Sequence, residues 1–384
     1  MSNPMIRAAT AWLAVLAGAC LAAAEVPGGP ELTLGQARKR ALASSPTLAA
    51  AGAGVAAADG ELRQAGAWPN PELEAAAEEL DGILSRSAES ETTLALRQPL
   101  PWLSRGPRRD AARWSSEAAR AGLDVARLDL VAEVDRRYAA ALAAQERLAL
   151  AEGNLATARE VVATVRELVK AGEVSPIELS RAEAEAVVVS TEMSSARLVL
   201  GMARLALAET LGERAPSFEA LAGTLAGEVR IPALGDLQER LGTLPEQRLL
   251  ESEEGRLGAE LALALRERWP EPAVRVGTFF RGADAEPAYV AGVSFQLPLW
   301  DRRQGAIAAA RARQEVGRQQ RRAEELQRGA ALASAHARLV QAQDETTQVV
   351  RDLLPRAEEV FTAIAEGYRR GELGLLDVLE ARRS

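Results

Sequence analysis

Histidine and cysteine are almost missing from this chain of 384 residues, which has one of each, His336 and Cys20. A structural zinc site takes several Cys and His ligands, so this sequence cannot build one, and a single cysteine excludes a disulfide within the chain. No Ser/His/Asp set and no phosphate-binding glycine loop occurs either. We therefore expect no metal site, no cofactor and no enzymatic activity, with His336 as a solvated or packing residue of a helix.

Aromatic residues are also scarce, at 4% of the chain, whereas alanine is abundant. This composition favours long helices packed side by side over a thick globular core. The net charge of −8 argues against nucleic acid as a partner.

Long apolar runs are absent except near the N-terminus, where Arg7 precedes an apolar stretch over residues 8–21 and then three alanines. A basic residue, a short apolar region and an Ala-x-Ala site are typical of an export signal, which we place at residues 1–24. The apolar run is too short for a membrane-spanning helix. Lipidation of Cys20 is the alternative, although the leucine of its signal lies one place too far upstream.

One passage occurs twice, beginning at Trp68 and again at Trp269. Each copy opens on Trp-Pro-x-Pro, carries two candidate strands, and closes on a Pro-Leu and Trp segment followed by arginines. The chain therefore looks like a duplicated unit. We expect a first repeat over 25–212 with strands at about 71–100, a connector over 213–233, and a second repeat over 234–384 with strands at about 272–299.

The candidate strands alternate between apolar and small or polar residues. Tyr289, Val293 and Phe295 would face one way, while Gly292 and Ser294 would face the other. The strand at about 73–80 is rich in Ala and Glu, and only its similarity to the second copy indicates a strand. Such alternation fits a half-buried soluble hairpin or a membrane barrel. Tryptophans at the strand ends, where an aromatic belt would lie, favour the barrel: Trp68, Trp102, Trp269 and Trp300.

Long helices are predicted between the strand pairs. Leu148, Leu155 and Val162 recur every seven residues, which indicates a coiled coil. Gly172 ends this helix, and Ser175 followed by proline starts the next one, which runs to about residue 211. The hairpin tips are therefore expected at about 171–176 and, in the second repeat, at about 370–375. The second repeat stops soon after its tip, so we expect it to lack its final helix, either because the sequence is a fragment or because this version is naturally shortened.

The duplicated architecture, the export signal and the motifs QAGAWPNPELE, ETTLALRQPL and PLWDRRQGAIAAA resemble the TolC family of outer-membrane efflux proteins, closest to its heavy-metal, CzcC-like branch. The resemblance implies a mainly α protein with a small β part: a homotrimer whose coiled-coil helices form a periplasmic tunnel topped by a 12-stranded barrel. It implies a Gram-negative outer membrane, its lipid, a periplasmic adaptor and an inner-membrane RND pump as surroundings and partners.

The resemblance also places the functional residues. Tyr368, Asp377 and Glu380 match the periplasmic gate, and the two acids share one helix face at i, i+3; a solvated acidic face is the alternative. Leu373 departs from an arginine that helps to lock the gate in the best-known member. The residues that would meet the adaptor, or else serve only as turns, are Gly172, Glu173, Val174, Ser175, Gly371, Glu372, Leu373 and Gly374.

The function implied is a passive exit duct for heavy-metal cations, although nothing in a chain so poor in Met, His and Cys selects a metal. One alternative is the periplasmic adaptor itself, which normally has one helical hairpin rather than two. The other is a periplasmic coiled-coil scaffold, which would leave the tryptophan-bounded strands unexplained.

Overall fold

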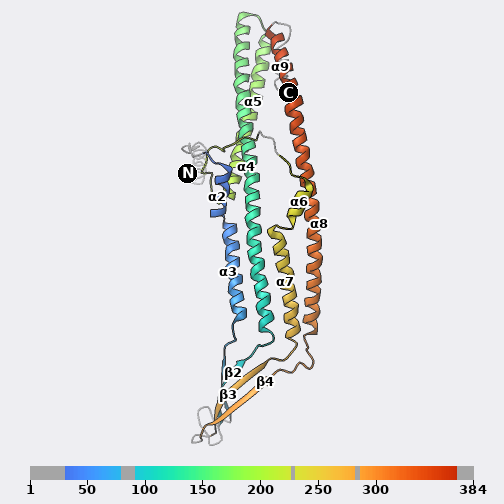
Figure 1. Ribbon diagram of the computed structural model, residues 1–384. Helices are drawn as coiled ribbons and strands as arrows, with labels where there is room; N and C mark the ends of the chain where they lie inside the picture. The colour runs from blue at the N-terminus through green and yellow to red at the C-terminus, as the bar shows by residue number, and fades with distance from the viewer. Residues whose placement is uncertain (1–30, 79–90, 226–229, 282–285, 370–384) are drawn as a thin grey trace, which may run out of the picture. The chain divides into compact units, whose positions relative to one another are not determined.

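The computed structural model describes residues 31–78, 91–225, 230–281 and 286–369 (Figure 1). The chain divides into two compact units. We call residues 31–49 and 127–225 the helical unit, and residues 50–78, 91–126, 230–281 and 286–369 the sheet unit. Two helices, α3 (Pro46–Gly66) and α4 (Arg105–Ala171), contribute residues to both. The predicted class, mainly α with a small β part, is confirmed.

The helical unit consists of α2 (Leu34–Ser44), the later part of α4 and α5 (Pro176–Thr210). α2 begins with a capping box: Gln36 N–H donates to the Thr33 hydroxyl over 3.2 Å, and Thr33 N–H donates to the Gln36 side chain over 3.0 Å. Two of the N–H groups that a helix start leaves without partners are thereby satisfied.

The core of the helical unit lies where α2, α4 and α5 meet the segment that follows α5. Tyr138 is buried there, and its hydroxyl lies 2.8 Å from the Leu32 carbonyl and 2.5 Å from the Ala222 carbonyl. Its single proton donates to one of these at a time. The buried residues of the cluster are Leu32, Ala37, Ala41, Val134, Tyr138, Ala141, Leu142, Leu207, Leu211, Phe218 and Leu221.

The paired part of α4 and α5 follows the predicted heptad. Leu155 is buried, and Leu148 and Val162 are half-buried, so the seven-residue seam faces inward. Ion pairs join the two helices at Arg166–Glu183 (2.8 Å) and at Arg197–Glu152 (3.4 Å). Both pairs lie symmetrically about the turn, which identifies an antiparallel hairpin.

The sheet unit holds α3, the first part of α4, α6 (Leu234–Leu241), α7 (Pro245–Arg266), α8 (Gln304–Gln348), a π-helix η1 (Val349–Leu353) and α9 (Leu354–Arg369). Glycine allows the close approach of α4 and α7, since a Cβ at Gly255 would lie 2.5 Å from the Trp114 ring. His336, on α8, places a ring nitrogen 3.1 Å from the Pro232 carbonyl.

The long helical segment that follows the second strand pair contains a π-turn, η1, between α8 and α9. Leu354 N–H donates to the Val349 carbonyl in this turn. Pro355 follows and has no N–H, so it cannot complete the regular ladder at this point. The widened turn is a local response to that proline.

The sheet has four antiparallel strands in the order β1 (Glu72–Glu78), β2 (Glu91–Pro99), β3 (Pro272–Arg281) and β4 (Ala288–Phe295). Figure 1 shows them side by side, beyond the ends of α3, α7 and α8. The two predicted strand pairs are joined through β2 and β3, where Leu96 lies opposite Val276. Two segments far apart in the sequence thus form one sheet.

Candidate functional site

The two faces of the sheet differ sharply in chemistry. Because side chains alternate along a strand, the register assigns every residue to one face. One face, which we call the apolar face, carries all the large exposed hydrophobic residues of the strands, including Tyr289, which is 85% exposed. Those residues are Leu73, Leu94, Leu96, Val276, Tyr289, Val293 and Phe295.

The opposite face carries the charged residues of the strands. Arg97 lies directly opposite Arg275 and Glu72 lies opposite Arg97, forming a row of charges across three strands. Arg97 pairs with Glu72 at 2.7 Å, and Arg275 Nε lies 3.1 Å from Glu74, close enough for an ion pair although not aligned for a hydrogen bond. We call Glu72, Glu74, Arg97 and Arg275 the charged ladder. The two glutamates offset the repulsion of two facing arginines.

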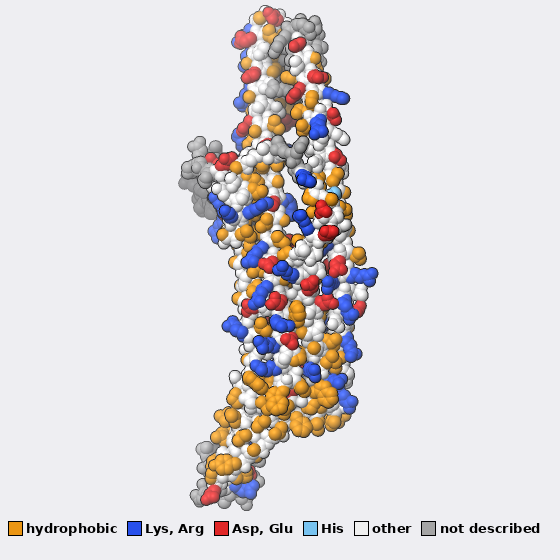
Figure 2. All heavy atoms as spheres, viewed as in Figure 1, with side chains coloured by type: hydrophobic (Ala, Val, Ile, Leu, Met, Phe, Trp, Pro, Cys, Tyr) orange, Lys and Arg blue, Asp and Glu red, His pale blue; other side chains and the backbone are white. Residues whose placement is uncertain are grey.

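Apolar side chains exposed over a whole sheet face need a cover. Monomeric soluble proteins seldom leave so large an apolar patch in water, so this face belongs against lipid or protein. The alternation of apolar and polar faces is also the pattern of strands in a transmembrane barrel. Figure 2 shows hydrophobic side chains gathered on the strands and where the helices of the sheet unit meet them.

The four predicted tryptophans all lie at one end of the sheet. Trp68 and Trp269 precede β1 and β3, whereas Trp102 and Trp300 follow β2 and β4, and antiparallel pairing places these four ends together. All four are exposed, Trp300 at 87%. They form one belt at the helix side of the sheet.

Several arginines make contacts at the junction where the strands of the sheet meet the helices. The Arg105 guanidinium lies 5.0 Å from the Trp68 ring and donates to the Gly66 carbonyl over 2.6 and 3.0 Å. Glu267 lies between two arginines, Arg108 at 3.9 Å and Arg303 at 3.4 Å. The junction is therefore fixed by several charged contacts rather than by a single linker.

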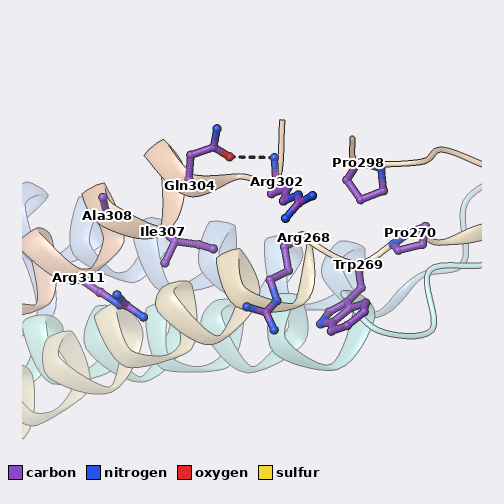
Figure 3. Close-up of a pocket in the computed structure, with 9 residues that line it drawn as sticks. All are labelled: Arg268, Trp269, Pro270, Pro298, Arg302, Gln304, Ile307, Ala308 and Arg311. Carbon is purple, nitrogen blue, oxygen red and sulfur yellow. Dashed lines mark hydrogen bonds between the residues drawn. The ribbon is translucent and has the colours of Figure 1, made fainter. Parts of the chain in front are cut away.

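An open pocket of about 740 Å³ lies between the end of α7 and the start of α8 (Figure 3). Three arginines line it, together with apolar residues and one glutamine. Its lining is Arg268, Trp269, Pro270, Pro298, Arg302, Gln304, Ile307, Ala308 and Arg311. Sequence reasoning missed this pocket, because only the fold brings the two segments that flank the second strand pair together.

The first predicted hairpin tip is a tight turn. Gly172 has φ +78°, its N–H donates to the Val169 carbonyl over 3.1 Å, and Glu173 N–H donates to the Leu168 carbonyl over 3.0 Å. This is a Schellman motif, which favours glycine because its left-handed backbone strains other residues. Ser175 caps α5, with its hydroxyl accepting from Ile177 N–H over 3.3 Å.

The surface around this turn mixes charge and apolar side chains. Glu173 is exposed and Val174 half-buried, and Ile177 is exposed on the first turn of α5. Lys170 pairs with Glu167 at 2.7 Å and Arg181 with Glu178 at 3.0 Å, both within one helix. The turn is therefore flanked by two ion pairs and one exposed apolar side chain.

The other predicted functional residues lie outside what the structure describes. These are Cys20, the gate acids Asp377 and Glu380, and the second tip of Gly371, Glu372, Leu373 and Gly374. Tyr368 belongs to α9, without a described side chain. Their roles stay predictions.

Neither a metal cluster nor a run of membrane-spanning helices occurs within the described ranges. No group of three or more His, Cys, Asp or Glu that could hold a metal was found there. One helix, α5, is long and apolar enough to cross a membrane by length and composition, and α2 with α3 passes only as a bent pair. α5 is 6% buried over its most apolar stretch, so that stretch is exposed in a single chain.

Sequence comparisons place these features in context. The model of the outer membrane efflux protein family matches residues 37–213 and 275–384. The chain is 29% identical over 357 residues to the cobalt-zinc-cadmium resistance protein CzcC of Cupriavidus metallidurans, covering 93% of this chain and 84% of CzcC. It is 31% identical over 310 residues to the nickel-cobalt-cadmium resistance protein NccC of Alcaligenes xylosoxydans xylosoxydans, covering 78% and 67%.

Solved structures of similar fold include three channels. The outer-membrane channel OprN superposes with a TM-score of 0.76 at 21% identity, covering 91% of this chain and 83% of OprN. The outer membrane protein VceC of Vibrio cholerae gives 0.74 at 22% identity, covering 91% and 89%. CusC gives 0.73 at 17% identity, covering 94% and 89%. These likenesses support the fold.

Proposed function

Because the chain belongs to the outer membrane efflux protein family, we propose that it is a passive exit duct of a tripartite efflux system, without chemistry of its own. Its place is the outer membrane, with the helices in the periplasm. The observation that carries this proposal is the two-faced sheet, apolar and exposed on one side, charged on the other, and bounded by tryptophans. Lipid accounts for the apolar face and a water-filled lumen for the charged one.

A single chain cannot complete such a duct. Four strands leave two unpaired edges, and a bilayer tolerates only closed sheets. Three copies would close a 12-stranded barrel. The exposed apolar side chains of α5 would then contact neighbouring helices of the tunnel; they are Ile177, Val187, Val188, Leu198, Val199, Met202 and Leu205.

The substrate we propose is a heavy-metal cation. The support is the similarity to proteins named for resistance to cobalt, zinc, cadmium and nickel. With no metal-binding cluster in the described ranges, the duct would conduct the ion rather than coordinate it, and the inner-membrane RND pump would choose it. A ring of Asp377 and Glu380 in three copies would attract cations at the periplasmic gate.

The turn at residues 172–175, with the predicted second tip at Gly371–Gly374, is proposed to dock the periplasmic adaptor. The paired charges and the exposed Ile177 beside the first turn suit a helical hairpin partner. The export signal at residues 1–24 would deliver the chain to the periplasm, and Cys20 would serve as a lipid anchor only under the alternative cleavage.

Single-channel recording tests the duct directly. The purified protein is added to planar bilayers, with the double variant Asp377→Ala/Glu380→Ala alongside. Stepwise current that rises in the variant is the expected result, since removing the acids opens the gate. Detergent-purified trimers that give no current in repeated trials would contradict the duct, and a protein recovered entirely from the soluble periplasmic fraction would favour the scaffold.

A further inference from the structure

The pocket at the end of α7 has more positive charge than its surroundings neutralise. Arg268, Arg302 and Arg311, which we call the arginine triad, line it, and no acidic residue does so within the described chain. The described residues provide no carboxylate within ion-pair distance of any of the three. Figure 3 shows the guanidinium groups of Arg268 and Arg311 directed toward each other beneath Ile307.

The acidic neighbours of the triad are engaged elsewhere. Glu267, next to Arg268, pairs with Arg108 and Arg303. Asp301, next to Arg302, accepts from the backbone N–H of Arg303 over 2.8 Å.

The first acidic residue of α8 is also engaged away from the triad. Glu315, one helical turn beyond Arg311, pairs with Arg318 at 3.4 Å and accepts from Gln319 over 2.8 Å. The positive charge of the triad is therefore left for a ligand. Guanidinium groups bind phosphate well, since their planar donors match its oxygens.

We propose that this pocket binds the headgroup of an anionic phospholipid, an inference that rests on the proposed place of the sheet in the outer membrane. The pocket lies just beyond the start of β3 at Pro272 and the end of β4 at Phe295, beside Trp269 of the belt. In a membrane barrel that is the depth of the periplasmic headgroups.

The walls of the pocket favour a lipid over free phosphate. More than half of its lining is apolar or aromatic, and Arg268 stacks 5.1 Å from the Trp269 ring. A phosphodiester with glycerol and the first methylenes of its chains fits a site that is cationic in one part and apolar in another. Inorganic phosphate would leave the apolar walls in water.

The test measures binding of short-chain phosphatidylglycerol to purified full-length protein in a neutral detergent by isothermal titration calorimetry. Trimer content and channel current are verified on the same preparation. Arg302→Gln/Arg311→Gln removes two charges without breaking an internal contact that the structure describes for those side chains. We expect the apparent Kd to rise about 25-fold, roughly fivefold for each arginine facing an anionic headgroup.

Arg322→Gln is the matched control, because Arg322 is an exposed arginine of α8 outside the pocket. It should leave the affinity unchanged. Phosphatidylcholine and inorganic phosphate, as separate ligands, should each bind much more weakly than phosphatidylglycerol.

Four outcomes would overturn the lipid site: equal affinity of wild type and double variant, equal binding of phosphatidylcholine, equal binding of inorganic phosphate, or loss of the trimer from the double variant before any lipid is added. The last would assign the triad to a contact between protomers. A preparation that binds phosphatidylglycerol as expected but passes no current would contradict the duct and leave the site standing.

Discussion

Replacing a residue of the apolar face by arginine tests the orientation of the sheet. Val276 is 57% exposed on that face, and Thr93 lies on the opposite face of the neighbouring strand. Val276→Arg would place a charge in lipid, whereas Thr93→Arg would place the same charge in a water-filled lumen. The two variants differ in the face they change and match in the residue they introduce.

The expected loss of stability in Val276→Arg depends on how deeply residue 276 would lie in the bilayer. Val276 lies four residues beyond the start of β3 at Pro272, which at about 3.3 Å per residue is about 13 Å along the strand. A tilt of about 40° places Val276 about 10 Å from the start of β3 along the barrel axis, near the middle of an apolar band about 25 Å tall. Arginine there costs about 2–4 kcal/mol per chain, hence about 6–12 kcal/mol per trimer.

The assay is unfolding by urea from lipid vesicles, followed by tryptophan fluorescence, together with the yield of protein in carbonate-washed outer membranes. Val276→Arg should strongly lower both the free energy of unfolding and the membrane yield, whereas Thr93→Arg should change them little. Equal losses in the two variants, or a greater loss for Thr93→Arg, would refute the assignment of faces. A Val276→Arg protein that stays folded and is fully released by carbonate would refute membrane insertion itself.

Three further predictions follow. Arg97→Gln/Arg275→Gln removes the positive charges of the charged ladder and leaves its glutamates unbalanced. The reversal potential of the channel should then shift toward the cation limit of about 59 mV in a tenfold salt gradient. An unchanged reversal potential in bilayers would show that the ladder does not line the lumen. Gly172→Ala should lower the free energy of unfolding by about 1 kcal/mol, because a φ of +78° strains any residue with a side chain, and it should weaken adaptor binding in a pull-down. A variant as stable as wild type in denaturation would contradict the turn geometry. The pKa of Asp59 is lowered chiefly by the hydrogen bond from Ser116, so the ionised carboxylate should stabilise the fold fully above about pH 4 and lose this effect as the pH falls through the lowered pKa. Asp59→Asn should therefore reduce the loss of stability at acid pH. A pH–stability curve identical to that of wild type would show that Asp59 does not contribute.

Much of the fold was predictable because its local signals are strong. The heptad of Leu148, Leu155 and Val162, the stop at Gly172 and the cap at Ser175 are short-range features, and each lies where the pattern predicts it. The weak strand β1 was predicted only through its repeat, since its alanines and glutamates favour a helix. Pairing with β2 overrides that helix preference, because the stability of a strand depends strongly on the strands next to it.

The sequence by itself predicted the long helices, the turn and cap between α4 and α5, and the alternation of strands β2, β3 and β4. These depend on neighbours within a turn of helix or a pair of strand residues. Only the tertiary structure decided that Arg97 faces Arg275, that four tryptophans share one end of the sheet, and that Arg268, Arg302 and Arg311 line one pocket. Those contacts join residues far apart in the chain, and their register is set by how β2 meets β3 and α7 meets α8, which no local pattern encodes.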